Sequence, residues 1–140
     1  MDVFINILIF LHIFGLVLGM GSGMAMSGVR RAMAGSADAT AFDGLISILG
    51  RNGHVGLAVL WITGPLVVWL KYGGVSGLDF WFWIKIVFVV ILSAALGIGA
   101  VNFRKGRAGD VRAAAIAKRA SAVTGISGLI VIFAAVFAFN

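Results

Sequence analysis

Three ionisable side chains lie within or beside long apolar stretches of this sequence: His12, His54 and Lys85. A protonatable group is costly in hydrocarbon, so a group that is retained there is a candidate for function. A neutral imidazole is the commonest metal ligand in proteins, and a His inside an apolar helix bundle is a usual axial ligand of haem. The chain has no Cys, so any redox chemistry must come from a bound cofactor.

The spacing of His12 and Lys85 predicts that both face other helices. His12 comes three residues before Gly15, on the same face of a helix, and Lys85 comes eight residues before Ser93. At 1.5 Å per residue the two lie ~13 and ~9 Å below the same membrane surface, so they share a site if their helices are neighbours. Two alternatives stay open: His12 forms only an interhelical hydrogen bond, and Lys85 extends outward to the headgroups.

His54 lies at the start of the second apolar stretch, after Arg51. Its depth differs from that of His12 by roughly 10 Å or more, so a haem ligated by both would need strong tilt or a longer second helix. The alternative is a polar residue at the membrane surface. Thioethers bind Cu(I), but the Met residues are spread around the first helix and fit packing better. No phosphate loop, carboxylate pair or zinc spacing occurs, so hydrolase chemistry has no candidate residues.

Four apolar segments must position these groups. The chain has 140 residues, of which 61% are hydrophobic, and its mean hydropathy is +1.12. A helix needs about 20 apolar residues to cross a ~30 Å hydrocarbon core. The segments that meet this length are about 3–27, 55–71, 80–101 and 120–139. They predict an all-α, single integral membrane domain of four antiparallel transmembrane helices, with a bend at Pro65 and a possible extension of the second helix back to Ala41.

The basic residues predict the orientation of these segments. The chain has 11 Lys and Arg residues and a net charge of +6. Nine of the 11 lie in the connections at about 28–54 and 102–119: Arg30, Arg31, Arg51, Arg104, Lys105, Arg107, Arg112, Lys118 and Arg119. The positive-inside rule places both connections in the cytoplasm and both termini outside a bacterial inner membrane. These residues either set the topology alone or also attract anionic lipid headgroups; their distribution does not indicate nucleic-acid binding.

Small residues at helical spacing predict where the helices pack. Transmembrane helices associate where small side chains let their backbones approach closely. The predicted faces are Gly15, Gly19 and Gly23 in the first segment, Ser93, Gly97 and Ala100 in the third, and Ser121, Thr124, Gly125 and Gly128 in the fourth. Such faces fit a compact bundle, and they also fit a seam in a homo-oligomer.

Several short motifs resemble a known family. They are Leu11-His12-Ile13, the Trp-Leu-Lys that ends the second segment, and the Trp-x-x-x-Lys from Trp81 to Lys85. Together they resemble the HemJ-type protoporphyrinogen oxidases and the wider group of four-helix CopD-like membrane proteins. The resemblance implies a b-type haem with His12 as an axial ligand, Lys85 as a functional intramembrane residue, and oxidation of protoporphyrinogen IX.

The sequence departs from the family pattern at two places. Gly15 to Gly23 stand where the family has Trp, Tyr and Arg, and Ala120 to Val123 stand where it has Asn-Glu-x-Pro. Without that carboxylate, the resemblance implies haem or porphyrin binding rather than oxidase activity.

Two function classes follow. In the first, the chain binds haem b or a porphyrin for electron transfer or porphyrin handling. His12 is then the metal ligand, His54 and Lys85 are further cofactor-binding candidates, and Lys85 is the catalytic candidate. In the second, the chain is a cofactor-free accessory subunit of a larger respiratory or photosynthetic membrane complex.

Overall fold

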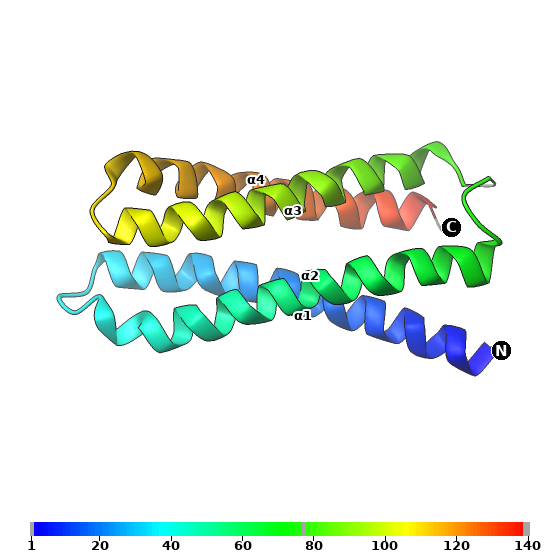
Figure 1. Cartoon of the computed structure of the whole chain (residues 1–140), viewed down its shortest axis with the longest axis horizontal. Coiled ribbons are helices and arrows are strands. Elements are labelled where there is room, and N and C mark those ends of the chain that lie inside the picture. The colour runs from blue at the N-terminus through cyan, green and yellow to red at the C-terminus, as the bar shows by residue number, and fades with distance from the viewer. Residues whose placement is uncertain (1, 77, 139–140) are drawn as a thin grey trace. The chain divides into compact units, whose positions relative to one another are not determined.

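The computed structural model describes residues 2–76 and 78–138, and their secondary structure is entirely helical (Figure 1). The elements are α1 (Asp2–Ala34), the short 3₁₀ helix η1 (Thr40–Phe42), α2 (Asp43–Tyr72), α3 (Phe80–Arg107) and α4 (Val111–Ala138). Among the described residues, four helical stretches are long and apolar enough to cross a membrane. The predicted all-α class with four helices of spanning length is confirmed.

The helices extend beyond the apolar segments that predicted them. α2 begins at Asp43, close to the possible extension back to Ala41, so most of the predicted connection 28–54 is helical, and a turn without helix is left only at residues 35–39. Likewise α3 runs on to Arg107 and α4 starts at Val111. Apolar composition marks only the part of a helix that meets hydrocarbon, whereas its hydrogen-bonded ladder continues until a turn residue ends it. Phe139 of the predicted fourth segment lies outside the described residues.

The chain divides into two units, Met1–Gly77 and Leu78–Asn140, and each unit is a helical hairpin. In the first hairpin the backbones of α1 and α2 touch at glycines. A Cβ atom on Gly56 would lie 2.6 Å from the carbonyl oxygen of Gly15 and 2.6 Å from the nitrogen of Gly19. A Cβ atom on Gly15 would lie 2.9 Å from Cγ1 of Val59. This crossing therefore requires glycine at Gly15 and Gly56.

The seam on α1 follows a seven-residue repeat. Its buried residues are Leu8, Gly15 and Ser22, and Gly19 packs near Gly53 of α2. Gly23 is exposed and has no atom near its Cβ direction, so the seam of this hairpin uses Gly15 and Gly19 of the predicted stripe but not Gly23. Steps of four residues drift around a straight helix, whereas alternating steps of four and three stay close to one face.

The seam of the second hairpin is built from small residues of α4. Its buried side chains include Ala113, Ala117, Ala120, Ser127, Val131 and Ala134. They are spaced by four and three residues, with the half-buried Thr124 completing the series. On α3 the closest approaches are made by Gly99, whose Cβ atom would lie 3.3 Å from the Ala120 side chain, and by Gly106, whose Cβ atom would lie 2.9 Å from Cα of Ala114.

The seam of the second hairpin uses only part of the predicted packing faces on α3 and α4. Gly128 is buried as expected, but Gly97 and Gly125 are exposed with no atom near their Cβ directions. On α3 the buried small residues are Ala95 and Gly99 instead. The sequence offers small residues on several faces of these helices, and spacing alone does not select the one that a neighbour covers.

Short polar turns end the helices. Gly73 adopts a left-handed conformation (φ 69°) after α2, and Gly109 does so (φ 102°) between α3 and α4. The Asp79 and Asp110 carboxylates each accept a 3.0 Å hydrogen bond, from the backbone N–H groups of Phe82 and Ala113 respectively. Both are amino-terminal caps, which satisfy an otherwise unpaired helical N–H.

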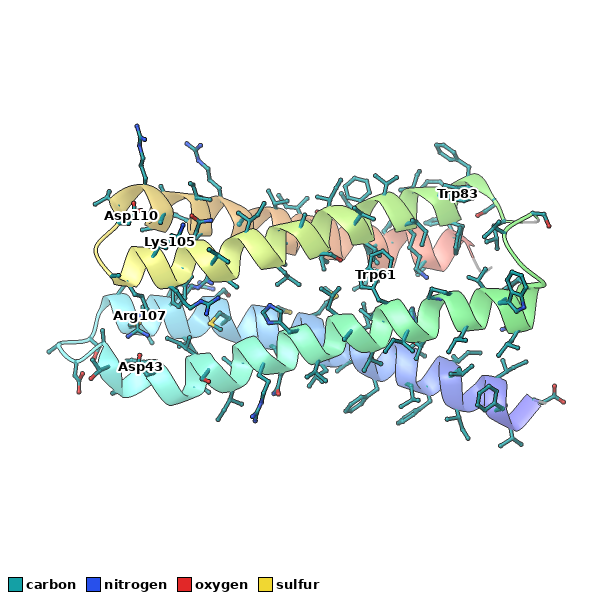
Figure 2. All side chains as sticks on the ribbon, viewed as in Figure 1. Asp43, Trp61, Trp83, Lys105, Arg107 and Asp110 are labelled. Atoms are coloured by element: carbon teal, nitrogen blue, oxygen red, sulfur yellow. The ribbon has the colours of Figure 1, made fainter. Side chains whose placement is uncertain are left out.

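The two ends of the second hairpin differ in character. Trp83 lies near the start of α3, and Lys105 and Asp110 lie at the turn end (Figure 2). Near the start of α3, the Trp81 ring packs on Phe133 and Phe137 of α4, with centroid distances of 6.2 and 5.2 Å. The second hairpin therefore has one aromatic end and one charged end.

We predict that Gly56→Ala destabilises the first hairpin by about 2 kcal/mol, because the added methyl group overlaps the α1 backbone. Gly50→Ala is the matched control, since nothing lies within 4 Å of its Cβ direction and Ala favours a helix over Gly by ~1 kcal/mol. Thermal unfolding in detergent measures both. Equal stability of the two variants would contradict the close crossing.

The turn before η1 is held by Asp38, whose exposed carboxylate accepts hydrogen bonds from the hydroxyl (2.6 Å) and the backbone N–H (3.0 Å) of Thr40. These bonds favour the ionised form and lower the pKa of Asp38 below its ordinary value; the bond from the Thr40 side chain is the largest cause. The turn is therefore most stable above the ordinary pKa of Asp, and this stabilisation is lost as pH falls through the lowered pKa.

We predict that Thr40→Val raises the pKa of Asp38 toward the ordinary value of about 3.9, because Val cannot donate the side-chain hydrogen bond. Thr40→Ser keeps the hydroxyl and is expected to keep the pKa low. A carboxyl ¹³C NMR titration of Asp-labelled protein in micelles follows the group directly. An unshifted pKa of Asp38 in the unsubstituted chain would refute the interpretation.

Candidate functional site around His12

The first hairpin joins His12 of α1 to Thr63 of α2. The Nδ1 atom of His12 lies 2.8 Å from Oγ1 of Thr63. Thr63 is only 4% exposed, and His12 is half-buried beside it. The structure thus places His12 on the seam between α1 and α2, beside a polar partner from the other helix.

The hydrogen bonds around Thr63 assign the tautomer of His12. Oγ1 of Thr63 also lies 2.7 Å from the carbonyl oxygen of Val59, which can only accept. The single hydroxyl proton of Thr63 goes to Val59, so Oγ1 must accept from an Nδ1–H of His12. In the neutral imidazole the lone pair is then on Nε2.

Small residues on α2 make this contact possible. A Cβ atom on Gly64 would lie 3.4 Å from Cε1 of His12, so the imidazole packs against bare backbone. The glycine crossing at Gly15 and Gly56 lies on the same seam and sets the distance between the two helices. Pro65, inside α2, comes directly after this segment.

A histidine held in this way suits metal ligation. Histidines that bind metals usually donate the N–H of the other ring nitrogen to an oxygen, which fixes the tautomer and the ring orientation. The bond from Nδ1 of His12 to Thr63 meets this requirement. The same bond also fits a purely structural role, in which it holds two membrane helices together.

His54 lies elsewhere on the first hairpin. It is exposed, and its Nδ1 lies 2.7 Å from the carbonyl oxygen of Gly50 one turn earlier in α2. Nine residues separate His54 from Thr63, or about 14 Å along the helix. Because His12 is level with Thr63, the hairpin does not place His12 and His54 on one haem.

Lys85 belongs to the other hairpin. It lies in the second turn of α3 and is half-buried. Its predicted role beside His12 stays a prediction from the sequence.

Thr63 is the site residue that sequence reasoning missed. A hydroxyl immediately before Gly64 and Pro65 in an apolar segment was the available signal, because it marks a polar group beside a backbone with room for a ring.

Among residues 2–76 and 78–138, no group of three or more His, Cys, Asp or Glu side chains is placed to hold a metal ion. No family model, curated protein or solved structure matches the chain.

We predict that ¹⁵N NMR of His-labelled protein shows His12 with its proton on Nδ1. Thr63→Val removes the acceptor, so the Nδ1 signal is expected to change and the hairpin to lose about 1 kcal/mol of stability. Thr63→Ser, which keeps the oxygen, is expected to preserve both. A His12 spectrum that is the same in the Val variant would show that the bond does not form.

Proposed function

We propose that this integral membrane protein binds a b-type haem or a related metalloporphyrin through Nε2 of His12. Its role is then electron transfer or the handling of porphyrins. The observation that supports the proposal is the hydrogen bond from Nδ1–H of His12 to Thr63, which leaves the ligating lone pair on Nε2.

The chemistry of the donor fits this cofactor. A single imidazole is sufficient for a metal that brings its other ligands with it, as iron does in haem. Bound haem would supply one-electron redox chemistry. The residues of the chain hold the imidazole: Thr63 fixes its tautomer, and Gly64 gives the ring space. The apolar surroundings, with Leu8 buried one turn away, limit access of water to the ligand.

The sequence supports the other two parts of the proposal, the orientation of the helices and the role of Lys85. The basic connections favour a four-helix antiparallel bundle in a bacterial inner membrane with both termini outside, which puts His12 and Lys85 in the same half of the bilayer. The resemblance to the HemJ-type oxidases supports the same cofactor, with Lys85 as the candidate for a group that interacts with a porphyrin carboxylate. The missing Asn-Glu-x-Pro motif makes binding a better proposal than oxidase activity.

We predict that the protein, expressed with haem available and purified in detergent, shows a Soret band that His12→Ala abolishes. His54→Ala is the matched control, because His54 is exposed and about 14 Å away along α2. Thr63→Val is expected to retain haem but to shift its reduction potential, since the hydrogen bond tunes the basicity of the ligand.

Two results would overturn the haem proposal: purified protein without a Soret band, or loss of the band in His54→Ala but not in His12→Ala. Far-UV circular dichroism confirms that each variant is folded. Absence of the band together with stoichiometric co-purification of other membrane subunits would favour the accessory-subunit alternative. The exposed glycines Gly23, Gly97 and Gly125 support that alternative, because they leave apolar helix faces open to close approach by another helix.

A further inference from the structure

A shallow apolar groove of about 370 Å³ runs along the second hairpin between α3 and α4. Its floor contains Ala95 and Ala120, both buried. The walls are branched apolar side chains from both helices: Ile91 and Ile98 of α3, and Ile116 and Val123 of α4. These wall residues remain 38–51% exposed. The groove is thus open on its outer side and lined with hydrocarbon.

The helix seam explains why the groove exists. Gly99 and Ala120 approach so closely that a Cβ atom on Gly99 would lie 3.3 Å from the Ala120 side chain. The small residues that permit this approach carry too little side chain to fill the surface above them. Larger residues on either side then form two walls around an unfilled floor.

One charged residue lines this groove. Arg119 is exposed and is the last charged residue of α4, because residues 120–138 contain none. Helical side chains lean toward the amino terminus of their helix, which for α4 is the hairpin turn at Gly109. We therefore expect the side chain of Arg119 to extend toward the hairpin turn, where the apolar part of α4 gives way to charged residues.

The surroundings of Arg119 are strongly positive. Residues 102–119 contain six basic residues and one acid, Asp110. The carboxylate of Asp110 is used as the cap of α4, where it accepts from the N–H of Ala113. Arg112 and Lys118 are exposed on the same helix. Of these basic residues, Arg119 is the one that lines the groove.

We propose that the groove binds an acyl chain of one anionic phospholipid, whose phosphate accepts hydrogen bonds from Arg119. Hydrocarbon walls with a guanidinium at one end complement a molecule that has an apolar chain and a negative head. The planar guanidinium matches phosphate in a bidentate manner. A free phosphate ion would gain nothing from the isoleucine walls, and a docked apolar helix would leave the charge of Arg119 unmatched.

The test is native mass spectrometry of the full chain, released from detergent after addition of phosphatidylglycerol or phosphatidylcholine. The unsubstituted protein is expected to retain one phosphatidylglycerol and to lose phosphatidylcholine. Arg119→Gln is expected to weaken retention about tenfold, as loss of a charged hydrogen bond implies. Arg112→Gln is the control: it lies seven residues away, about 10 Å, beyond the ~8 Å screening length at 0.15 M salt, and should leave retention unchanged.

A second variant tests the apolar part without changing charge. Ala94 lines the groove and is exposed, so Ala94→Phe fills the space of the acyl chain and is expected to remove the lipid about as strongly as Arg119→Gln. Both substituted positions are at the surface, so the variants are expected to fold. If one of them does not elute as a folded species, Arg119→Lys or Ala94→Leu replaces it as a milder substitution.

Several outcomes overturn the proposal. Equal losses in Arg119→Gln and Arg112→Gln would show diffuse attraction, and retention in Ala94→Phe would show that the groove is not used. Displacement of the lipid by inorganic phosphate would identify a free anion as the ligand. A dimer that Ala94→Phe dissociates would identify a second copy of the chain as the occupant.

Discussion

The contact between the α1 and α2 backbones at Gly15 and Gly56 is the constraint from which the geometry around His12 follows. In hydrocarbon, apolar side chains gain little by leaving lipid for protein, so helices associate through close contacts and interhelical hydrogen bonds. The glycine crossing supplies the close contacts. At that helix separation the short side chain of Thr63 reaches the imidazole and also bonds to its own helix at Val59.

The same physical situation gives the polar groups of this hairpin a defined direction. Thr63 has one hydroxyl proton and donates it in a hydrogen bond to the carbonyl of Val59, so the geometry favours a proton on Nδ1 of His12. Glycine packing, hydroxyl orientation and histidine tautomer are therefore one linked set. Loss of the Thr63 hydroxyl removes the hydrogen bond that holds the proton on Nδ1 of His12.

Much of this architecture could be predicted from the sequence, because hydrocarbon imposes length and composition on each helix. Four helices of spanning length and the packing of Gly15 and Gly19 against α2 follow from apolar runs and spacing alone. The helix ends could not be fixed from apolarity alone, since the sequence left the second helix to begin near Val55 or near Ala41, and α2 begins at Asp43. The choice between Gly97 and Gly99 on α3 depends on which face meets α4. Thr63 was missed because a lone hydroxyl in an apolar helix has no pattern until its partner is known.

The alanine seam of α4 has a consequence for how mutations act on the second hairpin. Ala113, Ala117, Ala120 and Ala134 offer almost no side chain to remove. Scanning the helix with alanine would therefore report these positions as unimportant. Such a seam tolerates shorter side chains but not longer ones, because one added isobutyl or benzyl group would force the helices apart. Natural variation at these four alanine positions should accordingly be confined to glycine, alanine and serine, however freely the outward residues change.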